Sequence, residues 1–426
     1  MRKRGIFGPT FLLLLMSLAS LVGTLPGISG EPTTIIVPDH YSTIQEALDN
    51  ANEGDTIFVR NGTYVETIVI NRTVSLEGES QEGTVIRIPE SERDIITITA
   101  DNVTVQGFTI RGTGLNWQGI WIRSSHCLVD GNIIEHVREG VFLDGRAHSI
   151  TDNVVTNNCI RNSDDCGVLV WSSTDNQIES NNITDNKWGV YFFSLGPKAT
   201  RNLVENNQII NSINAGVVLD LHSSSNIIKR NRVSSNGWLG DTYMSGIVLN
   251  VQSVANQILY NKIDNNKRGI YQYYASSSNS IHHNSLTSNG VQVYHEDHPE
   301  YPSVNVWDTG YPTGGNYWSD YVGTDLFRGL YQNETGSDGI GDTPYIIDAD
   351  NIDHYPLMNP YSPLPADVNE DLIVDIQDIA LVALCFGSCP THPRWDPVAD
   401  VNRDNQINVI DTALVASKFG TKWTPL

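Results

Sequence analysis

Residues 181–193 read NNITDNKWGVYFF, and residues 207–219 read NQIINSINAGVVL. Each copy has an Asn, an apolar residue, a polar turn, and then a Gly followed by a run of apolar residues. These apolar segments are too short for helices, and their β-branched and aromatic residues favour strands. One coil of a parallel β-helix needs this composition, because short strands stack about 4.8 Å apart while Asn and Gly make the tight turns.

The pattern recurs from about residue 100 to about residue 295. Its Asn positions span 152 residues in six steps, a mean period of about 25 residues, which indicates a solenoid. Leucine-rich repeats would require Leu at fixed spacing and propellers would require longer four-stranded repeats, so neither fits. We therefore predict an all-β fold, a right-handed single-stranded parallel β-helix with an internal amide ladder. The Asn positions are Asn132, Asn153, Asn181, Asn207, Asn231, Asn261 and Asn284.

A solenoid exposes apolar ends, so both ends should be capped. Upstream of the repeats, Ser42-Thr-Ile-Gln45 predicts the start of a helix with a capping box. Two strand-like segments follow, Thr56–Val59 and Thr67–Ile70, with a turn at Asn61-Gly62 between them. The sequence therefore predicts an N-terminal helical cap.

The first thirty residues have the order of a secretory signal peptide, with basic residues, an apolar run over 11–22 and then small residues. That run is short for the ~20 residues of a membrane span, and no later stretch is apolar for long enough. We expect cleavage, no membrane insertion afterwards, and a secreted, extracellular or cell-surface protein. The formal charge of −23 and the lack of a basic cluster argue against binding to nucleic acid or anionic lipid.

Export places the five cysteines in an oxidising compartment. The close pairs Cys159/Cys166 and Cys385/Cys389 could each form a disulfide that closes a short loop. Cys127 is left over, and we interpret it as a small buried apolar residue.

Some repeats are longer than others between the Asn and the following Gly. The interval is usually 6–9 residues, but it is 14 over 153–167, 15 over 231–246 and 11 over 108–119, where Phe108 takes the place of Asn. Because the enlargements share one phase, we expect them on one edge of the stack, where insertions commonly form a binding face. Indole rings beside carboxylates suit sugars. The candidate polysaccharide contacts are Trp117, Trp238, Asp241 and Tyr243; the alternative is elongated turns without a function.

After a Pro-rich connector the chain carries a duplication. Residues 367–387 read DVNEDLIVDIQDIALVALCFG, residues 400–420 read DVNRDNQINVIDTALVASKFG, and 11 of the 21 positions match. Oxygen ligands recur at loop positions 1, 3, 5, 9 and 12, and position 7 offers a backbone carbonyl, a spacing that wraps Ca²⁺. The predicted ligands of two sites are Asp367, Asn369, Asp371, Ile373, Asp375 and Asp378, and Asp400, Asn402, Asp404, Gln406, Asn408 and Asp411.

The entry segment VPDHYSTIQEALDNANEGDTIFVRNGTYVETIVI (37–70) resembles the first turns of pectin methylesterase-like β-helices. With the repeats, and with NVWDTGYPTGGNYWSDYVG (305–323) as a closing segment, the chain resembles the NosD-like family of secreted β-helix proteins over about 32–360. That family includes lyases, esterases, binders and copper-site accessory proteins, so the resemblance is specific for the fold.

The duplicated loop-plus-helix unit resembles a type I dockerin, which implies a small α-helical calcium-binding domain and a cohesin-like partner. Two departures stand out. Loop position 6, usually Gly, is Leu372 in one copy, which predicts a weaker first site because a positive φ there would cost about 1 kcal/mol. Positions 10 and 11 carry Ile376/Gln377 and Val409/Ile410 instead of Ser/Thr, so an unusual or intramolecular partner is the alternative.

Asp164-Asp165-Cys166 resembles the paired acids of β-helical polygalacturonases, which implies inverting hydrolysis with Asp164 and Asp165 as the catalytic residues. The companion Gly-His-Gly is replaced here by Lys187-Trp188-Gly189, which favours an acidic loop instead.

We therefore divide the chain into a signal peptide (1–30), a β-helix (31–300), its closing segment (301–357), a linker (358–366) and a dockerin-like domain (367–426). The function we expect is that of an exported β-helix protein that binds polysaccharide or processes it, in the second case as a hydrolase or lyase. The alternatives are a non-catalytic cell-surface or adhesive protein and a copper-site accessory protein.

Overall fold

The computed structural model describes residues 31–89, 94–113, 118–196, 198–296, 298–361, 366–369, 373–389, 392–396, 398–402 and 406–421. The expected signal peptide and the candidate residues Trp117, Asp371 and Asp404 lie outside these ranges. Within them, no helix has the length and apolar character needed to cross a membrane.

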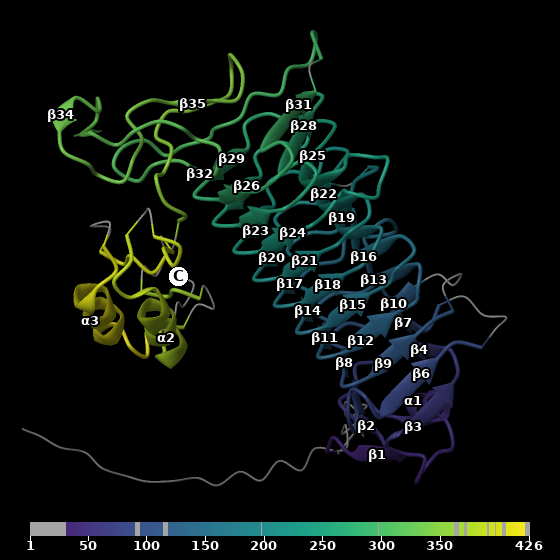
Figure 1. Ribbon diagram of the computed structural model, residues 1–426. Helices are drawn as coiled ribbons and strands as arrows, with labels where there is room; N and C mark the ends of the chain where they lie inside the picture. Colours follow the sequence, from purple (N-terminus) through teal and green to yellow (C-terminus); the bar gives the residue numbers. More distant parts are fainter. Residues whose placement is uncertain are drawn as a thin grey trace, which may run out of the picture. The chain divides into compact units, whose positions relative to one another are not determined.

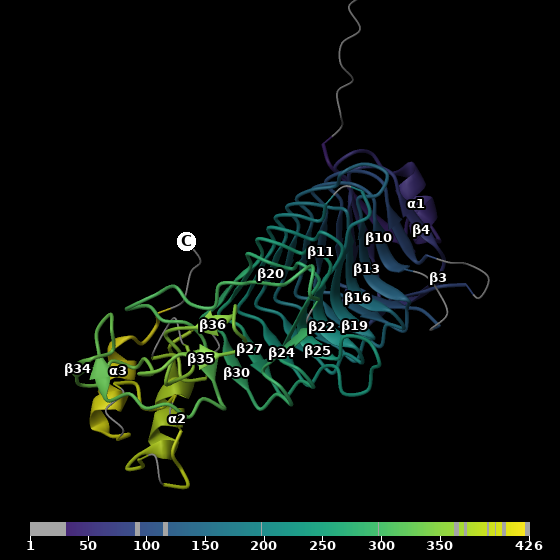
Figure 2. The same cartoon turned by 90° about the horizontal axis from the view of Figure 1, so that it is seen from above.

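The described chain up to residue 318 winds into a stack of coils that form three parallel sheets (Figure 1). A complete coil adds one strand to sheet A, then one to sheet B, then one to sheet C, so each strand pairs with its counterpart one coil away. The predicted parallel β-helix is thereby confirmed. Seen from above, the sheet C strands β10 to β25 follow one another along one face (Figure 2).

Sheet A consists of β1 (Thr34–Val37), β2 (Thr56–Val59), β5 (Ser75–Gly78), β8 (Thr104–Gln106), β11 (Leu128–Asp130), β14 (Val154–Thr156), β17 (Gln177–Glu179), β20 (Leu203–Glu205), β23 (Ile227–Lys229), β26 (Gln257–Leu259) and β29 (Ser280–His282). Sheet B consists of β3 (Gly62–Val65), β6 (Thr84–Arg87), β9 (Thr109–Arg111), β12 (Ile133–Glu135), β15 (Cys159–Arg161), β18 (Asn182–Thr184), β21 (Gln208–Ile210), β24 (Arg232–Ser234), β27 (Lys262–Asp264), β30 (Ser285–Thr287) and β32 (Tyr317–Trp318). Sheet C consists of β4 (Ile68–Ile70), β7 (Ile96–Ile98), β10 (Gln118–Ile122), β13 (Glu139–Asp144), β16 (Cys166–Trp171), β19 (Trp188–Phe193), β22 (Ala215–Leu219), β25 (Ser245–Leu249), β28 (Ile270–Tyr273) and β31 (Val293–Glu296).

The core lies inside the coils and consists of columns of apolar side chains. In sheet A the middle residue of each short strand points inward, so Ile178 pairs in register with Val204, and Val204 with Ile228. All three are fully buried. Complete burial of such a side chain is worth about 1.5–3 kcal/mol, and the columns repeat this contribution in every coil.

The N-terminal end is covered by helix α1 (Ile44–Asn50), which confirms the predicted helical cap. Its N-cap is Thr43, whose hydroxyl accepts a hydrogen bond from the Glu46 amide. Ile44, Ala47 and Leu48 are buried against the first coils.

Asn side chains form two long ladders inside the corners of the stack. In the ladder that precedes sheet B, the Asn181 side chain receives hydrogen bonds from Asn158 and gives one to Asn207. Asn153 belongs to the other ladder, which precedes sheet A, and its partner is Asn176. The predicted amide ladder is thus present, but the single series that included Asn153 combined two ladders.

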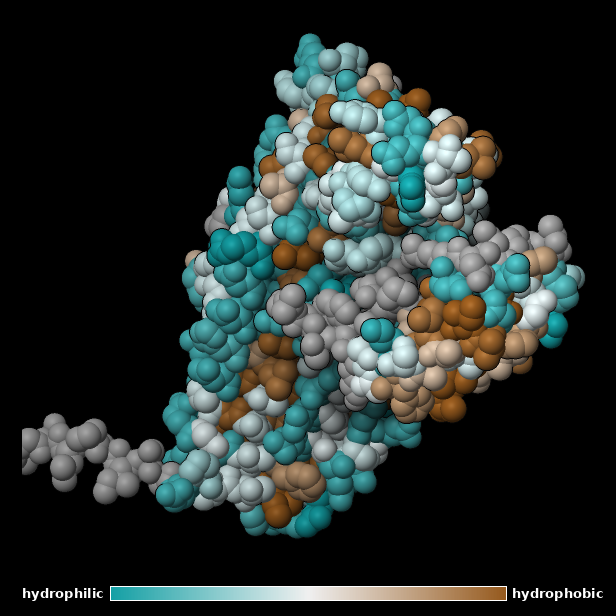
Figure 3. All heavy atoms as spheres, turned by 90° about the vertical axis from the view of Figure 1, so that its left-hand side faces the viewer, coloured by the Kyte–Doolittle hydropathy of each residue, from teal (hydrophilic) through white to brown (hydrophobic). Residues whose placement is uncertain are grey.

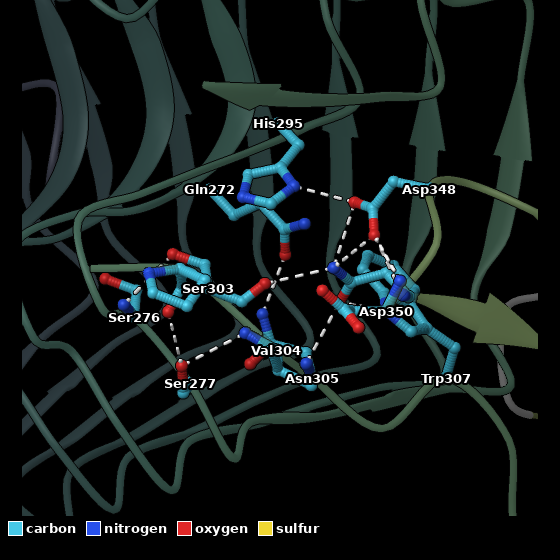
Figure 4. Close-up of polar contacts among 12 residues, drawn as sticks. Gln272, Ser276, Ser277, His295, Ser303, Val304, Asn305, Trp307, Asp348 and Asp350 are labelled. Atoms are coloured by element: carbon cyan, nitrogen blue, oxygen red, sulfur yellow. Dashed lines mark hydrogen bonds and ion pairs between the residues drawn. The ribbon is translucent and has the colours of Figure 1, made fainter. Parts of the chain in front are cut away.

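The closing segment ends both ladders. Asn305 donates its backbone N–H to Asn351 Oδ1, and Asn316 donates its N–H to Asp353 Oδ2. Figure 4 shows how His295 on β31 faces Asp348, with 2.6 Å between His295 Nδ1 and Asp348 Oδ2. The segment also forms two small antiparallel pairs: β33 (Phe327–Arg328) with β34 (Glu334–Thr335), and β35 (Tyr345–Ile346) with β36 (Ile352–Asp353).

The C-terminal part contains helices α2 (Ile376–Cys385) and α3 (Val409–Ser417). The two copies exchange backbone hydrogen bonds in a symmetric manner. Val374 pairs with residues 420–421 after α3, and Ile407, its equivalent in the second copy, pairs with residues 387–388 after α2. The duplication seen in the sequence is therefore a pseudo-twofold pair of loop-plus-helix units.

Candidate functional site

The turns from sheet B to sheet C all lie at one corner of the stack. The three segments expected to project together contain three of these turns: 112–117, 162–165 and 235–244. The turns 162–165 and 235–244 lie on the same edge, as predicted, whereas only residues 112–113 of the first turn are described; the middle turn is not enlarged. The ladder residue equivalent to Asn132 is Asn158, and only nine residues separate Asn158 from Gly167. The apparent 14-residue interval arose because Asn153 belongs to the other ladder.

A groove of about 680 Å³ runs across this corner, which we call the corner groove. It brings together Asp164 and Asp241, two candidates that are 77 positions apart in the sequence. Asp185 adds a third carboxylate and Lys187 a cation. The groove offers hydrogen-bond acceptors in a polar channel, the chemistry that sugar hydroxyls require. Its other lining residues are His136, Asn162, Ser163, Ile213, Asn214, Leu239 and Gly240.

The two adjacent acids have different surroundings. Asp164 is exposed and lines the corner groove. The Asp165 carboxylate lies 3.6 Å from Arg138 Nη2 and 3.9 Å from Lys187 Nζ, so it is part of an ion-pair cluster. This arrangement gives Asp165 a structural partner on each neighbouring coil.

The two aromatic candidates on the 235–244 turn also differ. Trp238 is half exposed, donates its indole N–H to the Asn265 carbonyl, and has Lys267 Nζ 5.3 Å from the centre of its ring. Tyr243 instead packs on the outer face of sheet C, 5.7 Å from both Trp188 and Tyr271 between ring centres.

The outer face of sheet C carries a continuous path of rings that sequence reasoning missed. We call it the aromatic strip. Neighbouring ring centres along the path are 4.7–6.3 Å apart, from β10 to β31. A signal was present, because WGVYFF (188–193) places Tyr191 and Phe193 at alternate positions and CGVLVW (166–171) ends on Trp171. The strip consists of six partly exposed rings, Trp121, Trp171, Tyr191, Phe193, Tyr243 and Tyr294, and of three buried rings that support them, Phe142, Trp188 and Tyr271.

Polar side chains hold these rings in place. The Asp220 carboxylate accepts hydrogen bonds from the Tyr191 hydroxyl at 2.6 Å and from Asn250 Nδ2 at 2.8 Å. Burial and the neighbouring Asp220 raise the pKa of the Tyr191 hydroxyl, so it stays a donor at physiological pH. Trp171 Nε1 and Asn250 Oδ1 have no hydrogen-bond partner among the described residues. The strip is therefore rigid and includes unused polar atoms.

Glu139 lies at the edge of the strip and was not a sequence candidate. Its carboxylate accepts a hydrogen bond from Gln118 Nε2 at 3.0 Å, and Arg138 Nε lies 3.4 Å away. Burial raises the pKa of Glu139 to about 7; Arg138 opposes this shift and Asp165 adds to it. The raised pKa of Glu139 depends on residues that adjacent coils bring together, and the sequence alone does not reveal these neighbours.

Glu139 should make the stability of the β-helix dependent on pH. Because its folded pKa lies above its unfolded value of 4.5, the folded state retains a proton that the unfolded state loses. This contribution is complete below about pH 4.5 and is lost as the pH rises through 7. Glu139→Gln should remove about 1–3 kcal/mol of the loss in stability between pH 5 and pH 8. Urea unfolding of both proteins at pH 5, 6, 7 and 8 measures the free energy of unfolding. If this free energy changes with pH equally in both proteins, the raised pKa of Glu139 is contradicted.

The cysteines of the β-helix do not form the expected bridge in the structure. Cys159 is on β15 in sheet B, whereas Cys166 begins β16 in sheet C and is buried beside Trp188. Both thiols are free, and the two residues belong to different sheets. Cys127 is buried in the core, as expected.

The second expected bridge, between Cys385 and Cys389, is not formed either. Cys385 is the last residue of α2 and its thiol is free. Cys389 lies beyond the end of the helix with its side chain exposed, and its carbonyl accepts a hydrogen bond from the His392 amide. The Cys385 carbonyl accepts the backbone N–H of Ser388 at 3.2 Å. Backbone hydrogen bonds shape this short loop.

In the C-terminal loops, the position-12 acids are Asp378 and Asp411, both fully buried. Asp378 accepts backbone hydrogen bonds from Val368, Asn369 and Asp375, so it ties its loop to the start of α2. The position-1 acids, Asp367 and Asp400, are buried as well. Within the described ranges no three His, Cys, Asp or Glu side chains are close enough to hold a metal ion, but each loop also has a candidate acid outside these ranges. Buried carboxylates at matched places fit a cation of the Ca²⁺ type.

The helices that follow these loops expose apolar side chains. Ile376 at the start of α2 is 64% exposed and its counterpart Val409 on α3 is 66% exposed. Leu384, Phe386 and Phe419 are exposed too. Figure 3 shows the hydrophobic residues gathered over this part of the surface. Such a patch is typical of an interaction surface.

Comparison with known families gives two matches. Residues 48–196 and 193–323 match the family described as periplasmic copper-binding protein (NosD). Residues 365–420 match the type I dockerin domain.

The chain is 30% identical to the cell surface glycoprotein of Methanothermus fervidus, over 73% of this chain and 56% of that protein. It thus spans about half the length of this curated relative. Among solved structures, the A-module of the Azotobacter vinelandii mannuronan C-5 epimerase AlgE4 superposes with a TM-score of 0.51 at 14% identity, covering 64% of this chain and 88% of that one. Tailspike protein 2 of an Escherichia coli O157:H7 bacteriophage gives 0.50 at 12% identity, over 72% and 46%. These likenesses show the β-helix fold.

Proposed function

The chain belongs to the NosD family and carries a C-terminal type I dockerin domain, and from this premise we propose that it is an exported protein that binds polysaccharide. The β-helix would present the glycan-binding surface, and the dockerin domain would attach it to a partner through calcium. The observation that carries the proposal is the aromatic strip on sheet C. Rings held at fixed orientation stack on the C–H faces of sugars, and nearby polar atoms bond their hydroxyls.

The corner groove extends the same surface, because the turn that carries Asp241 also carries Tyr243. If the protein is an enzyme, Asp164 is the better placed of the two predicted acids, since it is exposed in the groove. Asp165 is engaged by Arg138 and Lys187 and would position the turn.

Retention on immobilised polysaccharides tests the binding proposal. Trp171→Ala removes a ring from the middle of the strip and should weaken retention at least tenfold, about 1.4 kcal/mol. Tyr331→Ala removes an exposed ring of the closing segment, outside the strip and the corner groove, and should change retention less than twofold. Trp171→Phe keeps a ring and should retain most of the affinity, provided that the melting temperatures of all three variants match. Equal retention of Trp171→Ala and the unmodified protein would contradict the proposal.

A cell-surface protein without catalysis is the second candidate, and the relative named cell surface glycoprotein favours it. Measuring whether product is released from the retained polysaccharide distinguishes an enzyme from a non-catalytic surface protein. Turnover that is lost in Asp164→Ala or Asp165→Ala supports an enzyme, whereas retention with no product supports the surface protein. The copper-site alternative rests on the description of the matching family, since within the described ranges no group of three His, Cys, Asp or Glu side chains could hold a metal ion.

A further inference from the structure

The aromatic strip contains one contact that repeats along the stack. Trp121 Nε1 donates to Asp144 Oδ2 at 3.0 Å. The Tyr191 hydroxyl donates to Asp220 Oδ2 at 2.6 Å, and the Tyr271 hydroxyl to Glu296 Oε2 at 2.6 Å. In each case the ring is on one coil and the carboxylate on the next, which comes one strand later in sheet C or directly after it. We call these three pairs the clamps.

The clamps are equivalent by register. Trp121, Tyr191 and Tyr271 occupy one outward column of sheet C. Trp121 and Tyr191 are partly exposed, whereas Tyr271 is buried and presents its exposed partner Glu296 to the surface. The column also contains Phe142, Leu169, Val218, Val248 and Tyr294, of which Tyr294 alone is partly exposed. They lie on β10, β19 and β28, so two other strands separate one clamp ring from the next. With strands about 4.8 Å apart, the clamp rings are about 14 Å apart along the helix axis.

Two of the three arginines that stack on rings of the strip, Arg146 and Arg268, are engaged by other groups of the protein, and the third, Arg123, lies 4.8 Å from the centre of the Trp121 ring. Arg146 binds Asp144 through two hydrogen bonds, from Nε to Oδ1 at 2.7 Å and from Nη2 to Oδ2 at 2.8 Å. Burial opposes ionisation, but the Arg146 guanidinium still holds the pKa of Asp144 below its usual range. Arg268 stacks on Tyr294 at 3.8 Å and donates to the Tyr243 carbonyl. An anionic ligand would therefore find Arg146 and Arg268 already bound to other groups of the protein. It would also be repelled by a chain of formal charge −23.

We propose that the strip takes an uncharged, linear glycan that lies along the helix axis and is held at three equivalent clamps. This inference rests on the proposed function, which places the glycan on the strip. The spacing of the coils is close to the length of one sugar ring, so an extended chain advances about one ring per coil. A chain of about four rings reaches two clamps, and a chain of about seven rings reaches all three.

Affinity measured against chain length tests the inference on the full chain. The probes are β-1,4-linked gluco- and manno-oligosaccharides of two to ten rings, followed by calorimetry. We expect affinity to rise in steps near four and seven rings and to stay constant beyond about eight, because the strip ends at β31. Constant affinity from three rings onward, or a continued rise to ten, would overturn the axial arrangement but leave glycan binding intact.

One clamp can be removed at the end of the strip. Glu296→Ala takes away the acceptor of Tyr271 and should weaken binding of eight-ring oligosaccharides threefold to tenfold, while four-ring oligosaccharides bind as before. Glu300→Ala, an exposed acid outside the strip, is the matched control and should change neither. A loss that is equal at both lengths would contradict separate clamps.

Charge is tested with polygalacturonate and alginate in 20 mM and 500 mM salt. We expect binding of the uncharged series to be unaffected by salt, and the polyuronates to be retained at least tenfold more weakly. Preferential, salt-sensitive binding of a polyuronate would overturn the uncharged ligand alone. If neither the oligosaccharides nor the polyuronates bind, or if strip variants change only self-association in sedimentation, the proposed function fails together with the inference.

Discussion

Replacing Asn181 with alanine is expected to destabilise the β-helix by about 3–5 kcal/mol. The Asn181 side chain is buried and satisfies groups on three coils. Its Nδ2 donates to the Val155 carbonyl, the Glu179 carbonyl and Asn207 Oδ1. Its Oδ1 accepts from both the backbone and the side chain of Asn158. Alanine would remove the acceptor of the buried Asn158 backbone N–H and a donor to the Val155 carbonyl, each at a cost of about 1–3 kcal/mol. The Glu179 carbonyl, Asn207 Oδ1 and Asn158 Nδ2 keep other hydrogen bonds and add less.

The adjacent residue supplies the control. Asn182 is the first residue of β18 and its side chain is exposed, so Asn182→Ala should change stability by less than about 0.5 kcal/mol. Urea unfolding of the two variants, followed by tryptophan fluorescence, measures both. Similar curves for Asn181→Ala and Asn182→Ala would mean that the ladder contributes little to stability.

The ladders also explain what the sequence could and could not predict. Strands such as Thr56–Val59 could be predicted directly from short β-branched segments. The stacking of the strands could be predicted from the period of the repeat. The sequence did not show which Asn belongs to which ladder. Asn153 and Asn158 both precede a short strand and differ only in the corner of the coil that they occupy. Coil lengths vary with the turns, so spacing alone does not assign an Asn to a ladder.

The surface was harder to predict than the core. Tyr243 and Asp241 were recognised from a long turn, which is a local feature of the sequence. The strip was not, because Phe142 and Tyr191 alternate with core residues on the same strands, and the direction in which each side chain points depends on how the coil closes. The raised pKa of Glu139 has the same origin, since its partners come from neighbouring coils.

Removing calcium is expected to unfold the dockerin domain while the β-helix stays folded. Asp367 and Asp378 are buried in the first loop, and Asp400 and Asp411 in the second. Buried carboxylates are costly without a compensating charge, and a bound cation supplies it. At a free Ca²⁺ concentration 1,000 times the Kd, binding stabilises the folded domain by about 4 kcal/mol, a large share of the stability of so small a domain.

Hydrogen–deuterium exchange of the full chain with and without a chelator locates the effect. Peptides within 366–421 should lose protection, peptides of sheets A to C should keep theirs, and excess Ca²⁺ should restore the pattern.

Asp411→Ala should reproduce the chelated state, because Asp411 also accepts the backbone hydrogen bonds of Asn402 and Asn408. Asp378→Ala should have the smaller effect on calcium affinity, since we expect the first site to be the weaker one, with Leu372 at the loop position that usually carries Gly. Asp396→Ala, at an exposed acid between the two loops, should leave exchange unchanged. Protection that persists after chelation would refute calcium-dependent folding, because buried acids that remain ordered without a cation must be compensated by the protein itself.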